Sequence, residues 1–171
     1  MSYVAREVAS GCYSQGFLSR KLEQLIGPFY TLPISLVPKP SSNKFRMIQD
    51  LSFLWNDPRF SSVNSDINFD DFPTMWGTFN STAKLILSLP DGCLAVTFNI
   101  STTYQMTLVD PKQQILLCIF WEGKVYVDRA VMFGLSSSAG VFGSIADMLV
   151  AIYWVAGFGP LTKWVDDFFV I

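Results

Sequence analysis

Histidine is absent from the 171 residues of this chain. Because histidine is the commonest general base near neutral pH and a frequent zinc ligand, its absence excludes most hydrolase triads and the usual zinc sites. Cysteine is scarce as well, since Cys12, Cys93 and Cys118 are widely spaced and form no Cys-x-x-Cys pair. This spacing supports neither a zinc site nor a disulfide framework, and it favours reduced core cysteines in an intracellular protein.

Positive charge is also in short supply. Lys and Arg total 12 against 14 Asp and Glu, and the net charge is -2. Affinity for phosphates comes from clustered Lys and Arg, so this balance argues against a general polyanion binder. Any contact with nucleic acid is therefore expected to be local.

No signal peptide is expected, because the first residues, MSYVAREVASG, lack its apolar run. This predicts a protein of the cytoplasm or nucleus. The segment 141–160 is apolar over most of a membrane-spanning length, but it contains Asp147 and several glycines. We therefore predict a buried core helix there and no membrane partner, and membrane anchoring through residues 141–156 is kept as an alternative.

Half of the chain is hydrophobic, which suits one compact domain. The residue patterns alternate between helical and strand periodicities without a linker or a repeat. Helices are predicted at 17–26, 78–89 and 141–156, strands at 32–37, 44–49 and 93–100, hairpins at 115–128 and 161–171, and a surface loop at 56–76.

Two of the predicted strands carry candidate site residues. In the strand 44–49, alternation places Lys44 and Arg46 on one face, and with Lys39 they form a small basic ribbon or an ordinary solvated face. In the strand 93–100, Thr97 and Asn99 share a small, polar face of the kind that lines a site.

Two adjacent carboxylates, Asp166 and Asp167, stand at the turn of the last predicted hairpin, in KWVDDFFVI. Neighbouring acids repel each other, and burial adds a desolvation cost unless a cation or strong donors meet them. Asp is also common at exposed turns, so the pair alone is a weak signal. A cation is the partner that this arrangement would need.

Four sequence motifs follow one another between about Leu32 and the last residue. They are LPISLVPKPSSNKFRMIQDLS, FNISTTY, MFGLSSSAGVF and WVDDFFVI. In this order they resemble four motifs of reverse transcriptases, and the most similar motif sequences are those of retrotransposons. The first resembles the fingers segment, the second the first palm motif F-D-x-x-x-A-Y, the third the loop and helix P-F-G-L-x-x-A-P-x-x-F, and the fourth the Y-x-D-D hairpin.

The resemblance implies an α+β, right-hand polymerase fold with an antiparallel palm sheet backed by helices. Residues 1–92 would be mostly fingers-like and residues 93–171 mostly palm-like. We expect a single partial reverse transcriptase domain without the thumb and RNase H segments. Those segments would come from elsewhere, or the last strand would pair with another chain.

For the chemistry, the resemblance implies RNA-directed DNA polymerisation with two Mg²⁺ ions. Asp166 would be the principal metal ligand of the hairpin and Asp167 the supporting acid, with a weaker contribution from the Ile100 carbonyl. Asn99 stands where the family has its first-motif Asp, and an amide brings no negative charge. Activity is therefore expected to be weak or lost.

The resemblance also implies binding of an RNA or DNA template-primer and of deoxynucleoside triphosphates. Tyr104 would lie under the nucleotide sugar, and Phe133 and Gly134 would line the nucleotide pocket. Lys39, Lys44 and Arg46 would meet phosphates. The first motif departs from the family at Thr103 and Gln105 as well as at Asn99. A noncatalytic relic that binds nucleic acid or a protein partner is the main alternative.

Overall fold

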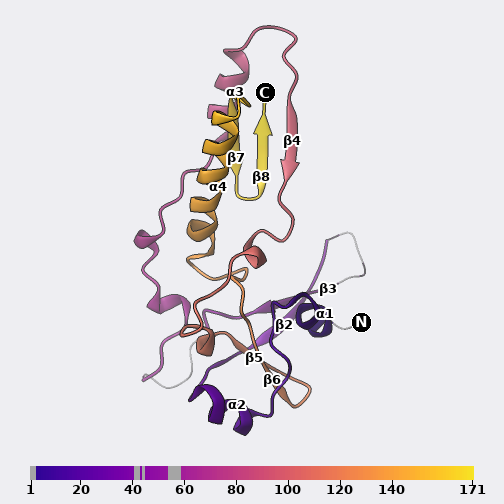
Figure 1. Ribbon diagram of the computed structural model, residues 1–171, viewed down its shortest axis with the longest axis vertical. Helices are drawn as coiled ribbons and strands as arrows, with labels where there is room; N and C mark the ends of the chain where they lie inside the picture. Colours follow the sequence, from indigo (N-terminus) through magenta and orange to yellow (C-terminus); the bar gives the residue numbers. More distant parts are fainter. Residues whose placement is uncertain (1–2, 41–42, 44, 54–58) are drawn as a thin grey trace. The chain divides into compact units, whose positions relative to one another are not determined.

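The computed structural model describes residues 3–40, 43, 45–53 and 59–171 (Figure 1). The chain divides into two compact units that interleave along the sequence. Unit 1 comprises residues 1–67 and 104–136, and unit 2 comprises residues 68–103 and 137–171. The α+β composition expected from the sequence is confirmed, whereas the fingers-like and palm-like division near residue 92 stays a prediction.

Unit 1 contains two short helices and two small sheets. Strand β1 runs parallel to β5, β5 pairs antiparallel with β6, and β2 and β3 form a separate antiparallel ribbon. The elements are α1 (Tyr3–Ser10), α2 (Ser19–Ile26), β1 (Thr31–Leu32), β2 (Ile34–Pro38), β3 (Phe45–Gln49), β5 (Cys118–Trp121) and β6 (Lys124–Val127), with single 3-10 turns at Asn64–Asp66, Tyr104–Met106 and Gln114–Leu116.

Local chemistry accounts for two boundaries in unit 1. The strand predicted over 32–37 divides at Pro33, which has no backbone N–H to offer a neighbouring strand. The β5–β6 hairpin turns at Glu122 and Gly123, whose φ values of 47° and 77° suit the right-handed twist of the flanking strands. The predicted hairpin is therefore confirmed, with its first strand shorter than expected.

The core of unit 1 lies where α1 and α2 pack on the β5–β6 hairpin. One cluster contains Leu22, Cys118 and Val125, and a second contains Val4 and Ile119. Burial raises the pKa of the Cys118 thiol to about 12, which keeps it protonated and unreactive. The expectation of core cysteines holds for Cys118 alone, because Cys93 is exposed and Cys12 is half-buried.

Unit 2 is built around an antiparallel sheet with the strand order β4-β8-β7. Its elements are α3 (Phe79–Leu87), β4 (Val96–Asn99), α4 (Ser138–Val155), β7 (Leu161–Trp164) and β8 (Asp167–Val170), with a 3-10 turn at Phe69–Asp71. The Thr78 hydroxyl accepts a hydrogen bond from the Ser81 N–H and caps α3. Helix α4 runs beside the β7–β8 hairpin (Figure 1), and Tyr153 contacts Phe98, which stacks on Phe168.

The prediction that the apolar helix is buried is wrong for its C-terminal half. The N-terminal half contains the buried Phe142 and Ala146, whereas Trp154 and Val155 are 69% and 86% exposed. Within the described residues, α4 is the one helix long and apolar enough to cross a membrane, a test of length and composition that core helices also pass. Periodicity identified the helix but could not show which turns another element covers.

A buried acid lies at the centre of unit 1. Asp128 is 5% exposed, and its carboxylate accepts a hydrogen bond from the Ala130 N–H. Desolvation is the main cause that raises the pKa of Asp128 to about 7, and the nearby Glu7 carboxylate adds to it. Ionised Asp128 is therefore a source of instability at neutral pH.

Replacing Asp128 with Asn is expected to remove a pH-dependent loss of stability. Because the folded pKa is higher than the ordinary carboxyl value of 3.8, the folded protein binds more protons, and the free energy of unfolding falls as the pH rises towards 7. At about 1.4 kcal/mol per pKa unit, the loss amounts to a few kcal/mol. Denaturant unfolding at several pH values measures it.

The matched control is Asp110→Asn, because the exposed Asp110 carboxylate also accepts an N–H two residues onward, from Lys112. We expect Asp110→Asn to keep the pH dependence of the unmodified protein and Asp128→Asn to flatten it. Equal slopes in both variants would show that the burial of Asp128 carries no such cost.

Gly140 lets α4 approach the preceding segment of unit 2 closely. A Cβ atom at this position would lie 2.4 Å from both the Cβ and the carbonyl oxygen of Phe72. We expect Gly140→Ala to lower the free energy of unfolding by about 2 kcal/mol or more, because backbone atoms cannot move aside cheaply. Ser144→Ala, at an exposed position of the same helix, is expected to change it by no more than about 0.5 kcal/mol in thermal unfolding.

Candidate active site

The two adjacent acids lie at the turn of the β7–β8 hairpin, as the sequence predicted. Trp164 pairs with Asp167, so Val165 and Asp166 form the two-residue turn. Val165 has a φ of 52°, a conformation that a β-branched residue rarely adopts. The turn therefore stores backbone strain, which is common where a structure must aim particular side chains.

Asn99 meets this turn from the neighbouring strand. It lies opposite Asp167 in the β4–β8 register, and its Nδ2 atom donates a hydrogen bond to Asp167 Oδ1 at 3.1 Å. The Ile100 N–H donates to the Asp166 carbonyl at 2.9 Å, which ties the end of β4 to the turn. The structure thus brings Asn99 and Ile100 next to Asp166 and Asp167, which lie at least 66 positions later in the chain. All four are predicted site residues.

The donor atoms at the turn suit a hard divalent cation only in part. Two carboxylates are ligands that Mg²⁺ accepts, and Asp167 is exposed while Asp166 is half-buried. However, Asn99 directs its NH₂ group at Asp167, and the Ile100 carbonyl already accepts the Thr103 hydroxyl at 2.7 Å. Within the described part of the chain, no group of three or more His, Cys, Asp or Glu is placed to hold a metal ion.

Behind the hairpin lies a buried ammonium group. Lys163 on β7 is 6% exposed, and its Nζ atom forms an ion pair with Asp147 and donates to the Gly143 carbonyl at 2.9 Å. The same atom lies 4.9 Å from the centre of the Trp76 ring. These contacts fix β7 to α4 and therefore fix the hairpin that carries the acids.

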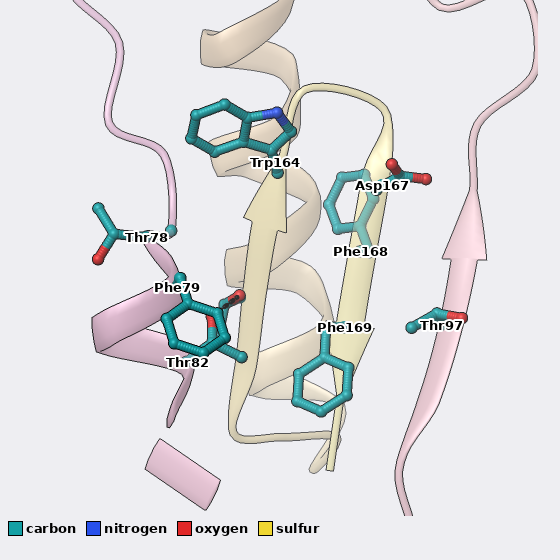
Figure 2. Close-up of a pocket in the computed structure, with 10 residues that line it drawn as sticks. Thr78, Phe79, Thr82, Thr97, Trp164, Asp167, Phe168 and Phe169 are labelled. Carbon is teal, nitrogen blue, oxygen red and sulfur yellow. Dashed lines mark hydrogen bonds between the residues drawn. The ribbon is translucent and has the colours of Figure 1, made fainter. Parts of the chain in front are cut away.

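The sheet face that α4 leaves uncovered forms a groove of about 630 Å³ beside the acids. Figure 2 shows Trp164 and Asp167 near the turn, Phe169 further along β8, Thr97 on β4, and Phe79 with Thr82 on α3. The predicted polar face of the strand 93–100 is thus on this side, because Thr97 lines the groove and Asn99 bonds to Asp167.

The remaining predicted site residues belong to unit 1. The Tyr104 ring is 8% exposed and packs edge-to-face on Phe133, with the ring centres 4.7 Å apart. Gly134 follows at a φ of 90°, and Phe133 is 72% exposed. Lys39 follows β2 and Arg46 lies on β3, both exposed, whereas Lys44 lies outside the described residues.

Sequence reasoning missed Asn64, which contacts the loop of Phe133 and Gly134 through its side-chain amide. The residue lies in the stretch SSVNSD, where Asn reads as an ordinary turn former. Its partners are 12 to 72 positions away, so no local pattern could have indicated them.

Solved structures of foamy viral protease-reverse transcriptases resemble this chain over nearly its full length. A native prototype foamy virus structure matches with a TM-score of 0.60 and 18% identity over 97% of this chain and 18% of that one. A complex with double-stranded DNA matches with a TM-score of 0.63 and 19% identity over 98% and 29%. A complex with an RNA/DNA hybrid matches with a TM-score of 0.62 and 20% identity over 97% and 18%.

The chain has a reverse-transcriptase-like fold. It spans less than a third of the length of these structural neighbours. No protein-family model and no curated protein matches it. The structural likeness therefore concerns the fold alone. Any catalytic chemistry depends on the residues at the β7–β8 turn.

We expect Asn99→Asp to destabilise unit 2 when no divalent cation is present. The change replaces a cross-strand hydrogen bond with two like charges, which costs about 1 kcal/mol at an exposed pair. Thermal unfolding at neutral pH in a chelating buffer measures the loss, and salt should reduce it. Asn99→Ala removes the hydrogen bond without adding charge, so an equal loss in both variants would exclude repulsion as the cause.

Proposed function

We propose that this chain is a reverse transcriptase-like domain of a retroelement, by descent an RNA-directed DNA polymerase, with activity reduced by Asn99. The observation that carries the proposal is the hydrogen bond from Asn99 to Asp167, next to Asp166, at one turn of a reverse-transcriptase-like fold. In the proposed reaction, a primer 3′-hydroxyl attacks the α-phosphorus of a deoxynucleoside triphosphate, and pyrophosphate leaves. The proposed partners are a template-primer duplex and the nucleotide.

Charge at the turn explains why we propose weak activity. Nucleotidyl transfer needs compensation of negative charge on the phosphates, which divalent ions supply when bound. Asp166 and Asp167 would hold such an ion, while Asn99 contributes an amide in place of a third carboxylate. If the missing charge costs about 4 kcal/mol at the transition state, the rate falls on the order of a thousandfold.

The neighbours support the proposed partners. Foamy viral structures of this fold were solved with double-stranded DNA and with an RNA/DNA hybrid. In this chain, Lys39 and Arg46 on the β2–β3 ribbon are exposed cations suited to phosphates. Tyr104, packed against Phe133, is proposed to lie under the nucleotide sugar, with Gly134 lining the same pocket.

A noncatalytic role in binding nucleic acid is the second candidate. It is favoured by the hydrogen bond from Asn99 to Asp167, which occupies a carboxylate oxygen that a metal ion would otherwise use. This candidate predicts template-primer binding that does not depend on divalent cations and no extension by any single-site revertant.

Primer extension on an RNA template with Mg²⁺ distinguishes the two candidates. The unmodified chain is expected near background, and Asn99→Asp is expected to gain activity by up to roughly a thousandfold. Asp166→Ala in the Asn99→Asp background should abolish the gain, and Asn99→Ala should show none. A folded Asn99→Asp protein that binds the template-primer but extends no primer would contradict the catalytic proposal.

A further inference from the structure

The side-chain amide of Asn64 forms hydrogen bonds with two residues of the turn that follows Phe133. Its Nδ2 atom donates to the Gly134 carbonyl at 2.9 Å and to the Ser52 hydroxyl at 2.9 Å. Its Oδ1 atom accepts the Ser136 N–H at 2.9 Å. The amide thus donates to one backbone carbonyl of the turn and accepts from one backbone N–H, as the backbone of a paired strand does.

The backbone around Asn64 is anchored to the same place in unit 1. The Asn64 N–H donates to the Leu51 carbonyl at 3.0 Å, and Leu51 is 2% exposed. The Leu51 side chain lies 3.6 Å from the position of a Cβ on Gly134. Asn64 therefore connects a buried residue after β3 to a turn whose glycine adopts a φ of 90°.

The turn that Asn64 contacts lies directly beside Phe133 in the chain. The carbonyl and N–H that Asn64 holds belong to Gly134 and Ser136, immediately after Phe133 in the chain. Phe133 packs edge-to-face on the Tyr104 ring, so a displaced turn would also disturb that contact. Asn64 is half-buried, and truncating its side chain to Ala removes all three hydrogen bonds of the amide.

We propose that Asn64 is a positioning residue that holds the Phe133–Ser136 turn in the conformation that receives the incoming deoxynucleoside triphosphate. The inference rests on the proposed function, because the nucleotide pocket at Tyr104, Phe133 and Gly134 is part of that proposal. It adds a residue that lies about 70 positions before Phe133 and Gly134 in the sequence and that is proposed to affect nucleotide affinity.

Two measurements on the full chain test the role of Asn64. Amide hydrogen exchange at Ser136 reports how well the turn is held. Nucleotide binding is measured as the affinity of the template-primer complex for dATP opposite a templating U, without turnover. We expect Asn64→Ala to accelerate exchange at Ser136 by about tenfold and to weaken dATP binding by about tenfold. A tenfold change corresponds to the net contribution of about one hydrogen bond. Template-primer affinity should stay unchanged.

Two further variants keep the test independent of misfolding. Asn64→Asp retains the acceptor for Ser136 but loses both donors, so its dATP affinity should fall while Ser136 stays protected. Ser65→Ala removes only the adjacent hydroxyl that donates to the Ser62 carbonyl, and it should match the unmodified chain in both measurements.

The outcomes separate this inference from the proposed function. Unchanged exchange at Ser136 in folded Asn64→Ala would show that Asn64 does not hold the Phe133–Ser136 turn. Faster exchange with unchanged dATP affinity would overturn the positioning role. If the unmodified chain binds template-primer but no dATP, both the nucleotide role of Asn64 and the proposed polymerase function fail. The exchange measurement then still shows whether Asn64 holds the turn.

Discussion

The buried ammonium group of Lys163 holds unit 2 together at the point where the acids are presented. A cation at 6% exposure is costly unless it is paired, and Lys163 has the Asp147 carboxylate, the Gly143 carbonyl and the Trp76 ring around it. Because these partners come from α4 and from the segment before α3, a single side chain ties two other parts of the unit to β7. The position of β7, and with it that of the hairpin, depends on this arrangement.

The hairpin in turn places the residues on which the proposed chemistry depends. Asp166 and Asp167 follow the turn at Val165, and β4 brings Asn99 directly opposite Asp167. With an amide there, Asp167 gains a neutral hydrogen-bond donor instead of a repelling neighbour. An amide at this position therefore favours the stability of the turn and disfavours the binding of cations. For this reason we propose descent from a polymerase together with weak activity.

The structural features that were predictable from the sequence depend on local patterns. Alternation along the strand 93–100 placed Asn99 and Thr97 on one face, and the turn residues of KWVDDFFVI located the final hairpin. The parts that were missed depend on distant partners. Lysine is usually exposed, so nothing local indicated the burial of Lys163, and Asn64 resembled an ordinary turn residue although its partners lie far along the chain. The exposed turns of α4 were missed because an apolar pattern does not show what covers it.

The most direct test of the central claim is a Mn²⁺ titration of the full chain followed by line broadening of backbone amide signals in NMR. We expect selective broadening at Asn99, Ile100, Asp166 and Asp167, at higher Mn²⁺ concentrations in the unmodified chain than in Asn99→Asp. Asp166→Ala should remove the effect in both. If neither protein shows broadening at this turn, or if Asn99→Asp binds Mn²⁺ no more tightly, the claim that Asn99 weakens a two-carboxylate cation site is contradicted.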